Sequence, residues 1–433
     1  MPRLLQIVHG YPPRELAGTE IYAERITRAL AKRDWEVHIL AATRAPGKPH
    51  GQWLTQEDSG AGGQIHRIVN NLPWRPLKAQ EHDPLLAKRC NARIAEIQPD
   101  LVHVQHLLFL DIGLNYGAPS LFTMHDAWAW CARAGSLLEM GNNPCPGPST
   151  ERCGPCYADF SRGQAVEHQL GRIAGKLDAI VPLEWMHKTW RALPARVRSL
   201  SKRGVPPTAT PAEVQSRQVA LREAINAFDL RISPSAFLAQ KGKEQGLDSI
   251  EVLRHGAQKQ TLQRKPEFFL FLGSLAFHKG PQIVVQAWQK AIAADPTLPP
   301  LRIVGPPVDP DCVATLPETQ VHAAVSPDEV PALLSKAHAL VLGSVWPENA
   351  PLVILEALAA GCPVIAPAIG GIPEMIQQDQ DGWLFPPGDV STLSDLLQRW
   401  QELKTLTVCA PNTFDEHLKQ LLEHYTDLLE GQR

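Results

Sequence analysis

Short apolar runs alternate with longer amphipathic stretches along most of this chain. Near the N-terminus, the run LLQIVHG is followed by a Gly-Thr-Glu turn, by apolar residues at helical spacing (Ile21, Ile26 and Leu30), and by a second apolar run over residues 37–40. Apolar residues three to four positions apart indicate an amphipathic helix, and short apolar runs bounded by turns indicate buried strands. The N-terminal segment therefore predicts a strand, a helix and a second strand.

The same alternation continues in two series. In the first series we expect strands at DLVHVQH, SLFTMHD, DLRISPS and EVLRHGA, and a mostly helical insert over residues 160–228 that a Pro-rich loop at 205–211 interrupts. After the polar residues 258–266, the second series contains FFLFLGS, a helix over 281–294, LRIVGPP, a helix through PDEVPALLSKA, ALVLGS, a helix that contains Glu356, and PVIAPA. Strands that alternate with helices predict an α/β fold with a parallel sheet covered on both faces in each half.

The length of the chain also predicts more than one domain. The chain has 433 residues, which is longer than the length at which a single hydrophobic core stops growing. We place an N-terminal Rossmann-like domain at residues 1–257, a C-terminal one at 258–412, and a final helix at 413–433. Ligands of open α/β sheets bind at the C-terminal ends of strands, so the loops after Val8, Thr123, Leu272, Val304 and Leu342 should face a cleft between the domains.

Glu356 is the only charged residue between Glu348 and Glu374. An unpaired buried carboxylate is unfavourable by about several kcal/mol, so Glu356 needs a partner, which is either a ligand or an Arg of the chain. Pro351 suits a first helical turn, and Asn349 is a candidate cap. The free N–H groups of that helix start then form a site for a diphosphate. Glu348 precedes this site, unless it is a loop carboxylate in solvent.

These residues carry a family resemblance that covers most of the chain. ENAPLVILE, followed by ALAAGCPVIA and GGIPE, resembles the E-x7-E signature of retaining nucleotide-sugar glycosyltransferases of family 4, which have two Rossmann-like domains in the GT-B arrangement. FLGSLAFHKG resembles the diphosphate-binding segment of that family, and residues 17–20 resemble its Gly-rich loop. ISPSAFLAQKGKEQGLDSIEVLRHGA is similar to the end of the N-terminal domain, and TFDEHLKQLLEHYTDLL to the C-terminal helix that crosses back onto the first domain.

The resemblance implies a role for each matching residue. Lys279 would bind the donor diphosphate, Glu356 the ribose hydroxyls, and Glu348 the donor sugar or the reaction centre. The family carries an Arg where this chain has Ser274, so Lys241, Lys243 or Arg254 would have to compensate, and Ala350 and Pro351 replace family glycines. The catalytic set is then Glu348, His125 and Lys279, and the donor-binding set is Gly18, Thr19, Gly273, Ser274, Lys279, Val325, Asn349, Ala350, Pro351, Leu352 and Glu356.

His125 and Asp126 follow an apolar strand and should lie at the cleft. A lone His is more often structural, but this pair is similar to the acceptor-side histidine of the family, which would hydrogen-bond the sugar or the acceptor hydroxyl. Two Asp-x-Asp sequences, at 309–311 and 379–381, lie in polar turns, and we interpret them as solvated loops. By the resemblance, Lys279 and a helix N-terminus replace a catalytic metal, so no cofactor is required for catalysis.

Four of the eight cysteines cluster at positions 131–156. Cys153 and Cys156 have the C-x2-C spacing of a structural zinc site, and Cys131 and Cys145 can complete a four-cysteine set. The Gly- and Pro-rich segment between them has little means of ordering itself without a cross-link. The alternatives are reduced free thiols and a redox or disulfide role. Such an element next to His125 would be a lid or an acceptor-side feature.

Composition limits the partners and the compartment. The net charge is −3 and the pI near 6.6, so no global basic field favours nucleic acid. The N-terminal apolar stretch is too short for a signal peptide, and no apolar run approaches the ~20 residues that span a bilayer. We expect a cytoplasmic protein. The segments NLPWRPLK and KTWRALPARVRSLSKR either make peripheral contact with the inner face of an anionic membrane or hold core tryptophans with solvated neighbours.

Together these features predict an enzyme, a hexosyltransferase-type glycosyltransferase (EC 2.4). It would move a sugar from a nucleoside-diphosphate sugar to a hydroxyl of a glycan or lipid-linked acceptor, in cell-surface polysaccharide or glycoconjugate synthesis. Two other functions stay open: a catalytically silent nucleotide-sugar-binding or assembly protein, which the absent arginine would suggest, and a nucleotide-sugar epimerase. No side chain of HAAVSPDE, the segment placed near the base, distinguishes uracil from guanine.

Overall fold

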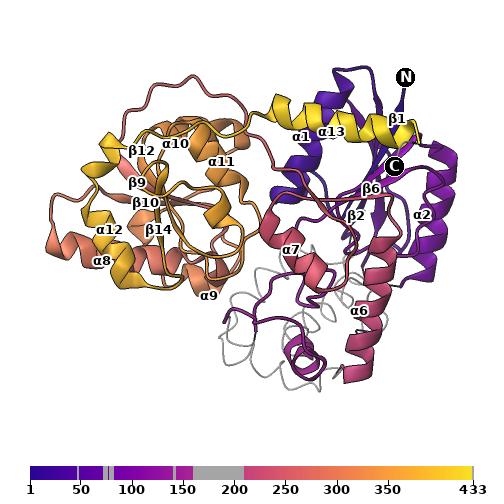
Figure 1. Ribbon diagram of the computed structural model, residues 1–433, viewed down its shortest axis with the longest axis horizontal. Helices are drawn as coiled ribbons and strands as arrows, with labels where there is room; N and C mark the ends of the chain where they lie inside the picture. The colour runs from indigo at the N-terminus through magenta and orange to yellow at the C-terminus, as the bar shows by residue number, and fades with distance from the viewer. Residues whose placement is uncertain (46–47, 72–76, 78–81, 140–142, 159–208, 432–433) are drawn as a thin grey trace, which may run out of the picture.

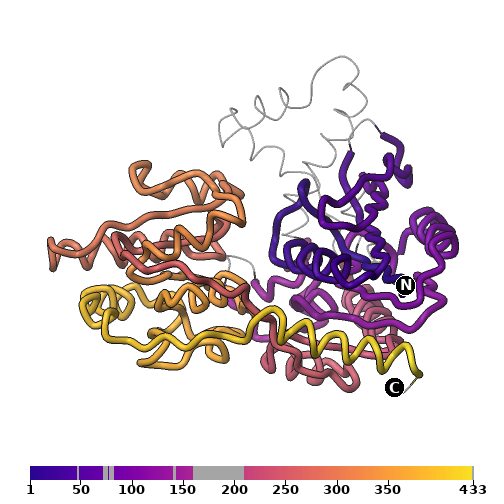
Figure 2. The backbone as a smooth tube through the Cα atoms, turned by 90° about the horizontal axis from the view of Figure 1, so that it is seen from above, coloured from indigo at the N-terminus to yellow at the C-terminus, as the bar shows by residue number. Residues whose placement is uncertain are grey.

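Two parallel sheets form the frames of two lobes (Figures 1 and 2). The computed structural model describes residues 1–433 except 46–47, 72–76, 78–81, 140–142, 159–208 and 432–433. The α/β expectation with two parallel-sheet domains is confirmed. The central strands of each sheet are almost wholly buried, as parallel strands covered by helices on both faces must be.

The first sheet has eight strands among the described residues, in the order β3-β4-β2-β1-β5-β6-β7-β8. All neighbours run parallel except β3 and β4. Its strands are β1 (Arg3–Val8), β2 (Glu36–Thr43), β3 (Glu57–Asp58), β4 (Gly63–Val69), β5 (Leu101–Val104), β6 (Ser120–Thr123), β7 (Leu230–Ser233) and β8 (Glu251–Val252). The helices of this lobe that lie wholly within the described residues include α1 (Gly18–Ala31), α2 (Pro84–Ile97), α6 (Pro211–Asn226) and α7 (Ala236–Glu244).

The second sheet has six strands, all parallel, in the order β11-β10-β9-β12-β13-β14. They are β9 (Phe268–Leu272), β10 (Leu301–Val304), β11 (Val321–His322), β12 (Ala337–Val341), β13 (Val364–Pro367) and β14 (Gly382–Phe385). The helices are α8 (Pro281–Ala294), α9 (Pro310–Val313), α10 (Val330–Ser335), α11 (Leu352–Ala359) and α12 (Val390–Gln398), with 3-10 turns η4 (Phe277–Lys279), η5 (Glu318–Gln320), η6 (Pro327–Glu329), η7 (Ile372–Glu374) and η8 (Glu402–Thr405).

The chain crosses between the lobes at two places that lie side by side. Ala257 and Thr413 form a parallel bridge, and a Cβ on Gly256 would lie 2.2 Å from the carbonyl oxygen of Thr413. After the second crossing, α13 (Phe414–Leu429) starts at a Thr413–Glu416 capping box and lies along the first lobe (Figures 1 and 2). Its apolar face joins the core of the first sheet through Leu418, Leu421, Tyr425 and Leu428. The C-terminal helix therefore closes the core of the N-terminal lobe, as the family resemblance implied.

Most of the elements expected from the sequence are present. The helix expected over 281–294 coincides with α8, and the strands of both series appear at the expected runs. The sequence interpretation missed β4, α2, β14 and α12. The helical insert is described only from residue 209 onward, where α6 begins behind a Thr210–Glu213 capping box. The rest of that insert, and most of both tryptophan-containing basic segments, lie outside the described residues.

Candidate active site

Lys279 and Glu348 form a partly buried ion pair at the C-terminal edge of the second sheet. Lys279 ends η4 after β9, and Glu348 follows the neighbouring strand β12. Lys279 Nζ lies 2.8 Å from Glu348 Oε1, and Ser344 Oγ donates to the same oxygen at 2.9 Å. Burial would raise the pKa of Glu348, but the charge and hydrogen bond of Lys279 outweigh it and lower that pKa. The alternative of a solvated Glu348 is wrong, because its side chain is only 8% exposed.

Close glycine contacts position the two loops that carry this pair. Gly280 has a φ of +71°, and a Cβ there would lie 1.8 Å from the carbonyl oxygen of Gly343, so only glycine fits. Gly370 also has positive φ, and a Cβ there would lie 2.1 Å from the carbonyl oxygen of Glu348. The next residue, Gly371, donates its N–H to that same oxygen at 2.7 Å. The backbone around Glu348 is therefore fixed by packing rather than by its side chain.

The helix that follows Glu348 begins without a side-chain cap. Pro351 is the residue before the first helical residue, Leu352, and no side chain caps the N-terminus of α11. The expected cap from Asn349 is wrong. Its Nδ2 instead donates to the carbonyl oxygens of Met124 and His125, at 3.1 and 3.0 Å, and its Oδ1 accepts from Ser235. Asn349 thus joins the two lobes, and no side chain of the described residues caps the first N–H groups of α11, so none competes there with an anion.

Glu356 is neither fully buried nor without a partner in the chain. Its carboxylate forms an ion pair with Arg25 of α1, with Nη2 and Oε1 2.5 Å apart, and its side chain is 21% exposed. Glu356 is less buried than its apolar sequence neighbours, because those neighbours face the core while Glu356 faces the other lobe. Of the two partners considered for Glu356, the structure shows the arginine, Arg25. Binding of a ribose by Glu356 remains a proposal.

His125 lies at the end of β6 in a cluster of aromatic and imidazole rings. The cluster also contains the rings of Tyr22, His255 and His417. The ring centroids of the contacting pairs lie 4.3 to 5.8 Å apart. Burial lowers the pKa of His125 to about 3, so its ring is neutral near pH 7. Its Nε2 donates to Gln105 Oε1 at 2.8 Å, which leaves Nδ1 as the hydrogen-bond acceptor of the ring.

A second polar group lies at this edge, and the sequence interpretation included only one of its members, Asp126. His9, His106 and Asp126 follow the C-terminal ends of β1, β5 and β6, which are neighbours in the first sheet. His9 Nε2 lies 3.0 Å from Glu20 of α1, and His106 Nε2 lies 3.2 Å from Asp126. Burial lowers the pKa of His9, but the hydrogen bond and charge of Glu20 outweigh it, so the pKa is raised. The position of each residue after a predicted strand could have signalled the group.

The other expected donor-binding residues follow strands β1, β9 and β11 in the chain. Gly18 and Thr19 start α1, Gly273 and Ser274 follow β9, and Val325 lies in the loop after β11. The residues suggested as substitutes for the absent arginine are bound elsewhere or exposed. Lys241 pairs with Glu244, Arg254 pairs with Glu374, and Lys243 is exposed.

The two Asp-x-Asp turns have structural roles. Asp309 caps α9 by accepting from the N–H groups of Asp311 and Cys312. Asp381 is buried and accepts from the N–H groups of Gln377 and Cys409, so the solvated interpretation is wrong for that residue.

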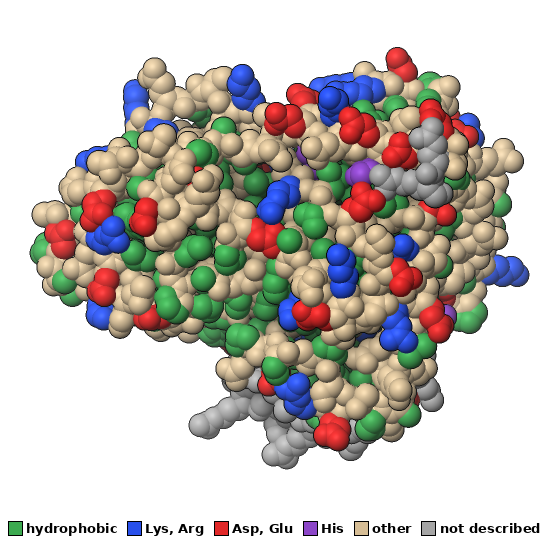
Figure 3. All heavy atoms as spheres, in the orientation of Figure 1, with side chains coloured by type: hydrophobic (Ala, Val, Ile, Leu, Met, Phe, Trp, Pro, Cys, Tyr) green, Lys and Arg blue, Asp and Glu red, His purple; other side chains and the backbone are tan. Residues whose placement is uncertain are grey.

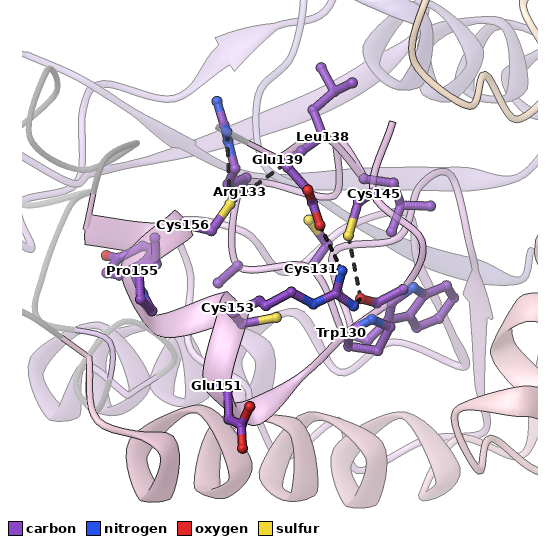
Figure 4. A pocket seen from close by; sticks show the side chains of 16 residues that line it. Trp130, Cys131, Arg133, Leu138, Glu139, Cys145, Glu151, Cys153, Pro155 and Cys156 are labelled. Carbon is purple, nitrogen blue, oxygen red and sulfur yellow. Dashed lines mark hydrogen bonds and ion pairs between the residues drawn. The ribbon is translucent and has the colours of Figure 1, made fainter. Parts of the chain in front are cut away.

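The four clustered cysteines line one cavity of about 300 Å³ (Figure 4). All four are free thiols, and burial raises the pKa of Cys131 to about 11. Cys145 and Cys156 donate to backbone carbonyls of Gly147 and Leu138. Among the residues that the structure describes, no group of three or more His, Cys, Asp or Glu side chains is placed to hold a metal ion. Structural zinc stays a prediction, which elemental analysis of the purified protein tests.

The visible surface carries no field of one sign. Acidic and basic side chains are interspersed over both lobes on the face shown in Figure 3. Within the described parts of the chain, no helix has the length and apolar character needed to cross a bilayer.

Comparisons with known proteins agree with this geometry. The family described as "Glycosyl transferases group 1" matches residues 256–412, and "Glycosyltransferase Family 4" matches residues 16–145. Sucrose-phosphate synthase from Thermosynechococcus elongatus matches with a TM-score of 0.61 at 16% identity, over 100% of both chains. Anabaena Alr3699/HepE, solved in complex with UDP and glucose, matches with a TM-score of 0.62 at 15% identity, over 99% of this chain and 100% of that one.

Sequence relatives match over shorter segments. Amylovoran biosynthesis glycosyltransferase AmsK of Erwinia amylovora is 42% identical over 52 residues, which is 12% of this chain and 13% of AmsK. D-inositol 3-phosphate glycosyltransferase of Corynebacterium efficiens is 30% identical over 143 residues, 29% of this chain and 32% of that protein. These matches span less than half of each relative. The two family matches together cover well over half of the chain, and the chain belongs to the family 4, group 1 glycosyltransferases with the GT-B fold.

Proposed function

We propose that this glycosyltransferase moves a sugar from a nucleoside-diphosphate sugar to a hydroxyl of a glycan or lipid-linked acceptor, with retention at the anomeric carbon. The observation that carries the proposal is the Lys279–Glu348 pair beside the uncapped start of α11. A cation and free helix N–H groups at one strand edge suit a diphosphate. The similar fold of HepE, which was solved in complex with UDP and glucose, supports a nucleotide-sugar donor.

The reaction breaks the bond between the anomeric carbon and the diphosphate and forms a bond from the acceptor oxygen on the same face. The departing phosphate takes the proton of the acceptor hydroxyl, and a nucleoside diphosphate leaves. Negative charge therefore grows on the diphosphate, where Lys279 and the dipole of α11 would stabilise it. Glu348 would hold Lys279 in place and hydrogen-bond the donor sugar. His125, a neutral ring with a free acceptor nitrogen, would bind a sugar or acceptor hydroxyl.

Two relatives favour a role in polysaccharide or glycoconjugate synthesis. One carries the name amylovoran biosynthesis glycosyltransferase, and the other is named for transfer to an inositol phosphate. A hydroxylated acceptor such as the inositol phosphate in the second name would suit the hydrogen-bonding side chains that follow β1, β5 and β6.

The test is a panel of nucleoside-diphosphate sugars, with binding read from thermal shift and turnover from released nucleoside diphosphate. We expect one donor to bind and to be turned over, and Glu348→Gln to lower turnover on the order of 100-fold with a smaller effect on binding. Binding without turnover in the unmutated protein would support a silent nucleotide-sugar-binding protein instead. An isomerised donor that accumulates without acceptor would support an epimerase.

A further inference from the structure

Arg25 and Glu356 connect the two lobes by an ion pair that the family resemblance did not include. Arg25 lies in α1 of the first lobe and Glu356 in α11 of the second, and both helices lie where the lobes meet (Figure 1). Arg25 Nη2 lies 2.5 Å from Glu356 Oε1, and the two side chains are 15% and 21% exposed. The pair is therefore largely shielded, yet both groups keep some access to solvent between the lobes.

The neighbouring arginine of the same helix shows that this orientation is specific. Arg28, one turn further along α1, is 51% exposed and bonds Glu24 of its own helix at 2.7 Å. Among the described residues, the Nη2 bond to Glu356 is the one side-chain bond of Arg25. A guanidinium has further N–H donors in a rigid fork. Arg25 therefore presents unused donors at the boundary between the lobes.

Charge balance at the proposed donor site calls for another cation. A diphosphate brings at least two negative charges, whereas Lys279 is already paired with Glu348. The position where the family carries an arginine holds Ser274. Lys241 and Arg254 form ion pairs with Glu244 and Glu374 instead. Arg25 bonds Glu356, the carboxylate proposed to bind the ribose. Because the ribose is covalently joined to the diphosphate, Arg25 would lie near the diphosphate as well.

Sharing of the Glu356 carboxylate is stereochemically reasonable. A carboxylate offers several lone-pair sites, so it can accept from ribose hydroxyls and still accept from one guanidinium nitrogen. The fork of Arg25 would then have N–H groups left for phosphate oxygens, the partners that arginine binds in pairs. A lysine could not reproduce this geometry, since its ammonium is a point charge.

Resting on the proposed function, we propose that Arg25 is a second donor-binding cation, supplied by the N-terminal lobe. Without ligand, Glu356 holds its guanidinium between the lobes. When a nucleoside diphosphate binds to the second lobe, Arg25 hydrogen-bonds the diphosphate. It thereby takes the place of the family arginine, whose position holds Ser274 in this chain. The donor would then be contacted by both lobes, and its binding would favour their closed arrangement.

The experiment compares Arg25→Ala and Arg25→Lys with a matched control, Arg28→Ala, from the same helix. Calorimetric titrations use UDP, GDP and ADP to find the diphosphate that the unmutated protein binds, and then the corresponding nucleoside. We expect Arg25→Ala to weaken diphosphate binding about 10- to 100-fold, the range for a charge-assisted hydrogen bond. Nucleoside binding should change less than about twofold, because the nucleoside carries no phosphate. Arg25→Lys should fall between, and Arg28→Ala should match the unmutated protein.

The results separate two failures. If the unmutated protein binds none of the three diphosphates, the proposed function fails and this inference fails with it. If it binds one, and Arg25→Ala binds that diphosphate as tightly or more tightly, only the inference is overturned, and the ion pair merely occupies Glu356. Melting temperatures of the variants show that each is folded, which we expect because Glu356 is partly exposed and can be solvated.

Discussion

The Lys279–Glu348 pair and the ring cluster around Tyr22 are both largely buried polar groups near the domain boundary, but one is ionised and the other is neutral. Burial would raise the pKa of Glu348, yet Lys279 keeps that pKa below its usual value. In the ring cluster, burial lowers the pKa of His125 to about 3 and that of His417 to about 4. The pair is therefore ionised near neutral pH, and the histidines are neutral.

The difference follows from the partners rather than from the depth of burial. Glu348 faces a cation at 2.8 Å, whereas His125 and His417 face aromatic rings and other imidazoles. An ionised, positioned lysine suits stabilisation of charge on a leaving diphosphate. Neutral imidazoles suit hydroxyl groups, which need hydrogen-bond acceptors and donors but no counter-charge. The two sides of the boundary thus suit the proposed donor and the proposed acceptor.

The largest effect should come from the ionised side. Lys279→Ala removes the cation beside the proposed leaving group, and we expect the rate of donor turnover to fall about 100- to 1,000-fold. The measurement is kcat from released nucleoside diphosphate, corrected for the folded fraction because Glu348 loses its partner. Lys88→Ala, at an exposed lysine of α2 in the first lobe, is the control. A kcat for Lys279→Ala within about threefold of the unmutated value would remove Lys279 from the mechanism.

Asn349 connects the two sides directly, so its loss should have an intermediate effect. Asn349→Ala removes the bonds to the carbonyl oxygens of Met124 and His125 and the bond from Ser235. The donor and acceptor sides would then be held less accurately, and we expect kcat/KM to fall about tenfold. Asn226→Ala, which loses bonds within the first lobe only, is the matched control. Equal values for the two variants would show that Asn349 does not position the lobes.

The neutral side should appear in the pH dependence of stability. A histidine whose pKa is lowered from 6.5 to about 4 contributes stability that is present above pH 6.5 and lost as the pH falls toward 4, because the unfolded chain binds the proton first. Replacing His417 by Gln should therefore make the fall in unfolding free energy between pH 6.5 and 5 shallower by up to about 1.4 kcal/mol per pH unit. Urea unfolding at several pH values measures this.

The control for that series is His322→Gln, at an exposed position of the second lobe. Its pH dependence should follow that of the unmutated protein. If His417→Gln has an unchanged slope as well, then His417 is not held neutral in the folded protein and the contrast between the two sides weakens.

The periodicity of the sequence was sufficient for most of the fold. Continuous apolar runs identified the central strands, the spacing of apolar residues placed α1, and the family resemblance indicated α13. Strand β4 was missed because its sequence, GQIHRIV, carries His66 and Arg67 at buried positions. Arg67 is fully buried but donates to the carbonyl oxygens of Tyr11 and Pro12 and to Glu57. Such compensation comes from residues far along the chain and leaves no local pattern.

Only the site residues that belong to sequence motifs could be predicted. The E-x7-E spacing and the lysine before Gly280 singled out Glu348, Glu356 and Lys279. The pairing of Glu348 with Lys279 and of Glu356 with Arg25 depends on tertiary contacts 69 and 331 residues apart in sequence. Asn349 was assigned a local capping role because its interlobe bonds depend on how β6 and α7 meet the second lobe.

The proposed activity depends on a single donor site formed by Lys279, Glu348, Glu356 and the start of α11. The decisive measurement is a crystal structure with the nucleoside diphosphate that the protein binds most tightly. We expect phosphate oxygens within hydrogen-bond distance of Lys279 Nζ and the first N–H groups of α11, with the ribose hydroxyls on Glu356. A nucleotide bound away from the ends of β9 and β12, with the Lys279–Glu348 pair unchanged and out of its reach, would show that this donor site is wrong.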